Sequence, residues 1–143
     1  MEFTTRAFSA PDLPDCLAIE QAAVRSNHYL ADVLDYYTTT RGEFTVVCAE
    51  GKPIGIGKLT VLYDNSAWLE LLRVHPQYQR QGAGTAIYRR YFEQLPQLGA
   101  DLQEILPLAA HRFHCREQVI FTAIAEQFQH PLGQLGMLLK AFV

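Results

Sequence analysis

A turn with two glycines joins an apolar strand to an amphipathic helix near the middle of the chain, and this junction constrains the fold more than any other feature. Residues 68–74 alternate as a strand does, and residues 85–95 have the periodicity of a helix. One face of the strand is predicted to carry Trp68, Leu72 and Val74, and the other Leu69 and Leu71. The apolar stripe of the helix consists of Ile87, Tyr88, Tyr91, Phe92 and Leu95. Such a junction forms an anion site, because backbone N–H groups converge where the helix dipole favours negative charge.

Phosphate is the anion that we expect at this turn. Gly82 and Gly84 would let a ligand approach the backbone without meeting a Cβ atom. Two common phosphate-binding turns do not fit the sequence. A Walker-type loop ends in Gly-Lys-Ser/Thr, and no lysine follows Gly84. A dinucleotide fingerprint needs a third glycine at position 87, which is Ile87.

The chain before the turn predicts a strand, two helices and a three-strand meander. Strands are expected over residues 3–8, 44–49, 54–62 and 68–75, and helices from residues 9–12 onward and over about 27–39. The connections at residues 50–53 and 64–66 have the length of hairpin turns. Gly55 and Gly57 share one face of a strand, where a ligand or a crossing helix would pack closely. Packing of the first helices on the sheet is the interpretation that we favour for these two glycines.

The turn reads Gln79-x-x-Gly82-x-Gly84 and follows a Val-x-Pro strand exit that begins at Val74. This pattern, with its strand and helix, resembles the coenzyme A pyrophosphate loop of the GNAT family of N-acetyltransferases. The resemblance implies an α/β (α+β) fold with a GNAT-like mixed, mostly antiparallel central sheet flanked by helices. It implies a single domain over residues 1–143, with a family-like core over about residues 3–100 and an atypical C-terminal part over residues 101–143.

The resemblance implies acetyl-CoA as the cofactor. In this family the strand before the loop separates from its neighbour, and its backbone binds the pantetheine arm, here through Leu72, Arg73 and Val74. The pyrophosphate would be held by the loop and the helix start, namely Gln79, Arg80, Gln81, Gly82, Ala83, Gly84 and Thr85. The Arg80 side chain would add a charge-assisted bond to a phosphate, or would be an ordinary solvated loop residue.

The resemblance also implies that a primary amine attacks the thioester directly in a ternary complex. A base must first take a proton from the amine, because an ammonium ion cannot attack. Glu70 is the candidate base, since it is the only carboxylate on its strand and alternation places it with Trp68, Leu72 and Val74. Alternatively, Glu70 faces solvent or a cross-strand lysine such as Lys58. The backbone N–H of Val74 is the candidate donor to the oxyanion.

The family lines its acceptor pocket with the first helix pair, here residues 22–41. Tyr29 and Tyr36 are the candidate substrate-binding residues, or else they are tyrosines that only pack the helices. The acceptor would be an amine of a small molecule, a peptide or a protein, and the sequence does not specify which.

The sequence departs from the family after residue 100. The family normally has an Asn-x-x-Ala-x-x-x-Tyr helix whose tyrosine protonates the leaving thiolate, and no tyrosine follows Tyr91. Because ordinary thiols have a pKa near 8.5, the thiolate could leave unassisted. The alternative is a non-catalytic CoA-binding or sensor module, or a protein-interaction module, and the apolar tail could form a homodimer. The residues His111, His114 and Cys115 lack a fourth ligand, so we expect no metal site.

Composition excludes several other classes of protein. With 49% hydrophobic and 19% charged residues, the chain has the composition of a globular domain. Its net charge of −3 argues against a nucleic-acid partner. We expect no membrane association, because no apolar run reaches the length of a membrane span and the N-terminus lacks a signal-peptide pattern. The three cysteines favour a reducing, cytoplasmic location over a disulfide framework.

Overall fold

The computed structural model describes residues 1–65 and 67–99 of the chain. Its strands are β1 (Phe3–Ala7), β2 (Gly42–Ala49), β3 (Lys52–Val61) and β4 (Ala67–Val74). Its α-helices are α1 (Leu13–Ala23), α2 (Leu30–Thr39) and α3 (Ala83–Gln94), and short 3-10 turns occupy η1 (Ala10–Asp12) and η2 (Pro76–Tyr78). The predicted α/β class and the predicted order of elements up to residue 99 are confirmed.

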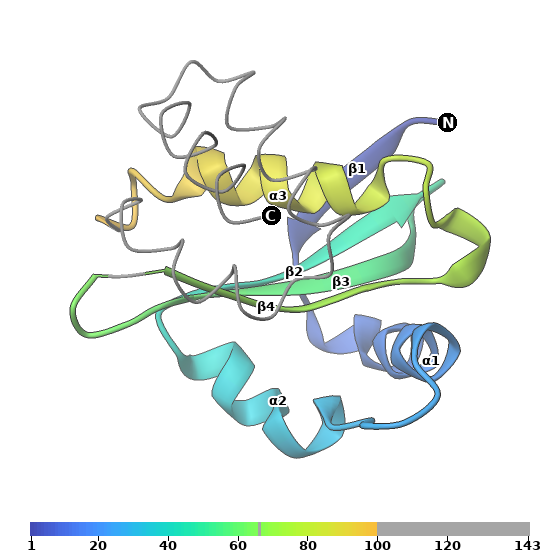
Figure 1. Cartoon of the computed structure of the whole chain (residues 1–143), viewed down its shortest axis with the longest axis horizontal. Coiled ribbons are helices and arrows are strands. Elements are labelled where there is room, and N and C mark those ends of the chain that lie inside the picture. Colours follow the sequence, from blue (N-terminus) through green and yellow to red (C-terminus); the bar gives the residue numbers. More distant parts are fainter. Residues whose placement is uncertain (66, 100–143) are drawn as a thin grey trace, which may run out of the picture.

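The four strands form one antiparallel sheet in the order β1-β2-β3-β4. Figure 1 shows α1 and α2 on one face of this sheet and α3 on the other. The hairpin between β2 and β3 turns at Glu50 and Gly51, which both have positive φ, as the tight turn of a twisted hairpin requires. None of the helices in the described part of the chain has the length and apolarity needed to cross a membrane.

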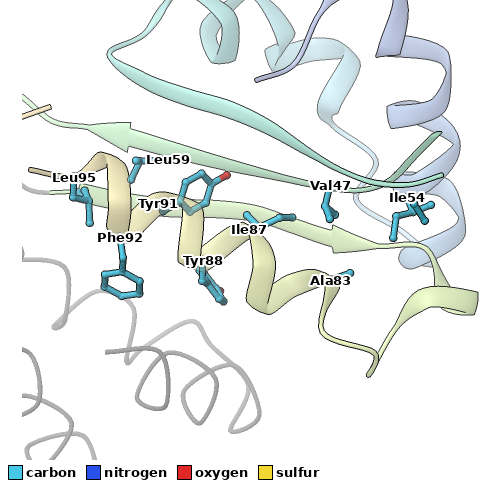
Figure 2. Close-up of a cluster of buried hydrophobic side chains, with 11 residues drawn as sticks. Val47, Ile54, Leu59, Ala83, Ile87, Tyr88, Tyr91, Phe92 and Leu95 are labelled. Carbon is cyan, nitrogen blue, oxygen red and sulfur yellow. The ribbon is translucent and has the colours of Figure 1, made fainter. Parts of the chain in front are cut away.

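Each face of the sheet carries its own hydrophobic core. The α3 core contains the predicted stripe of that helix together with side chains of all four strands. All five residues of the stripe are buried, and Figure 2 shows Ile87 and Tyr91 between α3 and the strands. The α1/α2 core contains Cys16, Ile19, Leu30, Tyr37, Phe44, Val46, Cys48, Ile56 and Leu71.

Gly57 allows α3 to lie directly on β3. A Cβ atom built on Gly57 would lie 2.8 Å from the Tyr91 hydroxyl and 2.9 Å from the Ile87 side chain. On Gly55 it would lie 2.7 Å from the Val47 side chain. The two glycines therefore face the later crossing helix, and our preferred interpretation, packing of the first helices, was wrong. The physical reason is that odd-numbered positions of β3 in this region point to the α3 face.

A polar network joins α3 to β2. Arg90 donates two hydrogen bonds to the Glu43 carboxylate, from Nε at 2.6 Å and from Nη2 at 2.9 Å. Gln94 Nε2 and Thr45 Oγ1 donate to the same carboxylate at 2.6 and 2.5 Å. Burial by itself would raise the pKa of Glu43, but these hydrogen bonds outweigh burial and hold the pKa below its usual value.

On the opposite face, α1 determines where α2 begins. The carboxylate of Glu20, which is 2% exposed, accepts hydrogen bonds from the N–H groups of Tyr29 and Leu30 at 3.0 and 3.2 Å. These donors belong to the first turn of α2 and its cap, where N–H groups have no partner within the helix. Glu20 thereby caps α2 from a neighbouring helix and orients the connection between them.

Candidate functional site

A β-bulge interrupts β4 in its middle. Lys58 of β3 pairs with Glu70, whereas Ile56 pairs with Arg73, so β4 has one more residue than β3 in this interval. Leu71 has a φ of +57°, a left-handed conformation that is uncommon for a residue other than glycine. Bulges of this kind redirect side chains and occur often beside active sites.

The bulge changes which face each β4 side chain occupies. Leu69, Leu72 and Val74 pack against the α3 core, whereas Leu71 is buried in the α1/α2 core. Glu70 lies near Tyr37 of α2 and therefore on the α1/α2 side. We predicted that Leu69 and Leu71 share one face and that Glu70 shares the other with Leu72 and Val74. Both predictions were wrong, because Leu71 lies opposite Leu69 and Glu70 lies opposite Leu72 and Val74. The extra residue shifts the alternation by one position, so the same face holds Glu70 before the bulge and Leu71 within it.

Glu70 belongs to a group of polar side chains on the α1/α2 side of the bulge. Thr60 Oγ1 donates to Glu70 Oε1 at 3.4 Å, and Lys58 is the register partner of Glu70. Burial, followed by the charge of Glu70, raises the pKa of the Tyr37 hydroxyl above its usual range. We call Lys58, Thr60, Glu70 and Tyr37 the bulge cluster. Of the alternatives for Glu70, the sheet adopts the one in which Glu70 lies across from Lys58.

Beyond the bulge, the end of β4 directs backbone groups away from the sheet. His75 N–H donates to Ile54 O at 2.8 Å, so Gly55 and Val74 form a non-hydrogen-bonded pair. The N–H and C=O of Val74 therefore point away from β3. Gln79 Nε2 donates to this C=O at 2.9 Å. The N–H of Val74 is a donor at the edge of the described sheet.

The turn between β4 and α3 is exposed and has two left-handed residues, Arg80 with φ +62° and Gly82 with φ +99°. Gln79 and Gln81 use their side-chain amides to bind carbonyl groups of the same turn, that of Val74 and, at 2.7 Å, that of Gln77. These bonds stabilise the shape of the turn. Left-handed residues in such turns make concave arrays of N–H groups that bind anions.

At the start of α3, three backbone N–H groups precede the first hydrogen bond of the helix. That bond runs from Ala86 N–H to Gly82 O at 2.9 Å, which leaves the N–H groups of Ala83, Gly84 and Thr85 before it. Ala83 is buried, whereas Gly84 and Thr85 are half-buried. The helix start therefore presents donors and the positive end of its dipole beside the turn.

The structure explains glycine at position 82 of the turn but not at position 84. A Cβ on Gly82 would meet no atom within 4 Å, so its positive φ accounts for the glycine. A Cβ on Gly84 would lie 3.6 Å from the Leu72 side chain, which is ordinary contact. The packing of the described residues would therefore accept a methyl group at position 84. The same distance shows that the end of β4 and the start of α3 lie side by side.

Residues 9–117 match the sequence model of the acetyltransferase (GNAT) family. The chain belongs to the GNAT acetyltransferase family. No curated protein shows significant sequence similarity to the chain.

Solved structures agree with this GNAT fold. Ard1 from Thermoplasma volcanium has a TM-score of 0.62 at 22% identity, over 70% of this chain and 68% of its own. The ribosomal-protein-S18-alanine N-acetyltransferase from Escherichia coli has a TM-score of 0.58 at 25% identity, over 69% of this chain and 63% of its own. A GNAT acetyltransferase from Brucella melitensis, in complex with acetyl-CoA, has a TM-score of 0.61 at 20% identity, over 69% of this chain and 71% of its own.

The remaining predicted site residues of this GNAT protein lie in three places. Arg73 donates from Nη1 to Leu72 O at 3.0 Å, and its buried Nε has no hydrogen-bond partner among the residues that the structure describes. Tyr29 is half-buried against the α1/α2 core and is one of the groups that act on the Tyr37 hydroxyl. Tyr36 is 49% exposed, with its ring 5.9 Å from that of Tyr37. Tyr29 thus approaches the bulge cluster, and Tyr36 lies on the outer surface of α2.

Three members of the bulge cluster, Lys58, Thr60 and Tyr37, were not among our candidate site residues. The signal for Lys58 was present, because it is the one charged residue inside the apolar run of residues 54–62. Tyr37 lies within residues 22–41, the segment that the resemblance places at the acceptor pocket. Within residues 1–65 and 67–99, no three potential metal ligands come together, and His111, His114 and Cys115 lie outside the described residues.

Proposed function

We propose that this GNAT protein binds acetyl-CoA along the end of β4 and the start of α3, and transfers the acetyl group to a primary amine of a small molecule or protein. The observation that carries the proposal is Gly84. The packing of the described residues does not require glycine at position 84. Gly84 lies beside Leu72, among the N–H donors at the start of α3. A ligand that lies against the backbone there supplies the missing reason.

The donors of the turn suit a pyrophosphate. The N–H groups of residues 79–85 surround a turn with two left-handed residues and the positive end of α3. The Arg80 side chain is exposed beside them and would add a charge-assisted bond to a phosphate. The pantetheine arm would run along Leu72, Arg73 and Val74, where the Val74 N–H points away from β3.

In the proposed reaction Glu70 takes a proton from the acceptor amine, and the Val74 N–H stabilises the oxyanion. Val74 follows Glu70 by four residues, roughly 13 Å at most along an extended strand. Glu70 lies before the bulge and Val74 beyond it, so the proton would pass to Glu70 through ordered water. Tyr29, beside Tyr37, and the exposed Tyr36 would contact the acceptor from α2.

We choose the acceptor to test by analogy with a structural neighbour. One structural neighbour is an N-acetyltransferase of an alanine of ribosomal protein S18. A peptide with a free N-terminal alanine is therefore the first acceptor to test, followed by a small primary amine. The second candidate function is a CoA-binding module without turnover, which the absence of a tyrosine after Tyr91 favours.

Calorimetric titration with acetyl-CoA and CoA tests the cofactor site. We expect Gly84→Ala to fold at least as stably as the native protein, since alanine favours helices, yet to lose tenfold or more in affinity, about 1.4 kcal/mol. Gly82→Asp and Gly82→Asn form a matched pair, because both side chains tolerate left-handed φ to a similar degree and only one carries charge. Weaker binding by the aspartate variant than by the asparagine variant would indicate a bound anion. No binding by the native protein would end the proposal, and binding without turnover on any amine would favour the second candidate.

A further inference from the structure

Lys58 is a buried cation without a hydrogen bond. Its side chain is 0% exposed, and its Nζ has no hydrogen-bond partner among residues 1–65 and 67–99. Burial lowers the pKa of Lys58, while the charges of Glu70 and Glu43 oppose that effect. Removal of an ammonium group from water without compensating hydrogen bonds costs stability. Apolar packing at this position would avoid that cost.

The nearest counter-charge to consider is Glu70, because it is the direct register partner of Lys58 across β3 and β4. The pair stands next to the bulge, where Leu71 has a left-handed backbone. The titratable groups that act on Lys58 or on Tyr37 are Glu43 of β2, Glu70 itself and Tyr29 at the cap of α2, and Glu20 of α1 binds the Tyr29 N–H. Glu43 and Glu20 are already engaged, with Arg90 and with the start of α2. Of these three glutamates, Glu70 is the one whose carboxylate is held by neutral side chains, those of Thr60 and Tyr37.

We infer that Lys58 is a positioning residue for Glu70. Its buried amine draws the Glu70 carboxylate toward β3 and holds it on the α1/α2 side of the bulge, where an acceptor amine would meet it. The role rests on the proposed acetyltransferase function, but the pairing of the two residues across β3 and β4 exists in the free protein. Lys58 itself touches no substrate, since its side chain has no exposed surface.

The variant Lys58→Met removes the charge and keeps an unbranched apolar chain. Lys52→Met is its matched control, because Lys52 lies on the same strand with an exposed side chain and a distant partner, Asp15 at 3.9 Å. We expect Lys58→Met to raise Tm by about 3 °C or more, since the cost of the buried charge disappears. In the same variant the carbon-13 resonance of the Glu70 carboxyl should shift in NMR spectra recorded at neutral pH without CoA. Lys52→Met should change neither quantity.

The reciprocal variant covers the case in which Lys58→Met does not fold. In Glu70→Gln the Lys58 Nζ should lose its proton at lower pH than in the native protein, because coupling between two sites is mutual. If neither the Glu70 resonance nor the Lys58 titration moves, the two groups are not coupled and the positioning role is wrong.

Kinetics then separate positioning from packing. We expect Lys58→Met to lower kcat tenfold or more, to leave CoA affinity within twofold, and to move the acidic limb of the rate profile to higher pH. In the Glu70→Gln background the same substitution should have no further effect on kcat. An unchanged pH profile, or losses that simply add, would overturn the proposal. Failure of the native protein to bind CoA would overturn the proposed function instead, and the NMR measurements would still decide whether the two groups are coupled.

Discussion

The hydroxyl of Tyr91 occupies the space that a side chain at Gly57 would fill, with only 2.8 Å between the hydroxyl oxygen and the position of a Cβ atom. Tyr91 is 2% exposed, and its hydroxyl has no hydrogen-bond partner in the described part of the chain. Contact between α3 and the middle of β3 therefore depends on the absence of one methyl group. The helix that carries the candidate phosphate site at its N-terminus is seated on the sheet through this contact.

Gly57→Ala should destabilise the protein by about 1–3 kcal/mol, because the new methyl group would overlap the Tyr91 hydroxyl and the Ile87 side chain. Urea unfolding measures the loss. Tyr91→Phe by itself should change stability little, since it removes a hydroxyl without a partner. Combined with Gly57→Ala it should restore part of the loss. Equal losses in both backgrounds would mean that the hydroxyl is not the obstacle.

Glu20→Ala should destabilise the fold by about 1–2 kcal/mol, because two N–H groups at the start of α2 would lose their acceptor. Glu20→Gln retains one carbonyl oxygen and should lose less. Amide hydrogen exchange would locate the effect, with faster exchange at Tyr29 and Leu30. Unchanged exchange at these two amides in Glu20→Ala would contradict the capping role.

Asp12 should contribute stability that depends on pH. It accepts two hydrogen bonds from Arg6, at 2.6 and 2.8 Å, and two from Ser9. The hydrogen bonds from Arg6 lower the pKa of Asp12 well below its usual range, with burial opposing them. Its contribution is therefore complete above the pKa of the unfolded chain, near 4, and declines as the pH falls toward the folded value.

Comparison of Asp12→Asn with the native protein by urea unfolding measures this contribution. We expect a deficit of about 1–2 kcal/mol at pH 7 that shrinks as the pH is lowered below 4. The exposed Asp32→Asn, in the first turn of α2, serves as the control and should show a smaller deficit. A deficit that grows in acid would have the wrong sign for this assignment.

The buried cysteines should be chemically inert in the folded protein. Burial raises the pKa of Cys16 to about 12, and burial also raises the pKa of Cys48. Thiol reagents attack the thiolate, which is scarce at pH 8 under these conditions. Peptide mapping after alkylation at pH 8 should find both residues unmodified in native protein and modified in denaturant. Rapid native labelling of Cys16 would show that the α1/α2 core opens.

The helices and the order of strands were predictable because periodicity determines which face of an element is buried. The stripe from Ile87 to Leu95 was predicted residue by residue, since no irregularity interrupts α3. The faces of β4 were predicted correctly only in part, because period-two alternation assumes an uninterrupted ladder. Nothing in the sequence marks Leu71 as left-handed, since glycine or asparagine is the usual residue in that conformation. The position of the bulge depends on pairing with β3, which is a property of the folded sheet.

The candidate phosphate turn was predictable for a different reason. Its signal is local, because Gly82 and Gly84 lie at fixed distances from a strand end and a helix start. The pairing of Glu70 with Lys58 was one of our alternatives, but the whole bulge cluster was not predicted, since it also needs Tyr37 from a helix earlier in the chain. Only the register of β3 with β4 and the placement of α2 bring these side chains together.

The extra residue in β4 makes one strand contribute side chains to two compartments, one on each face of the sheet. Before it, Glu70 looks toward α2, and after it, Leu72 and Val74 look toward α3. Changes in α1 and α2 can therefore remodel the compartment that would receive the acceptor, while the compartment that would hold the acetyl donor keeps its shape. Such a domain can change the acceptor that it would bind while it keeps the site that would hold the acetyl donor.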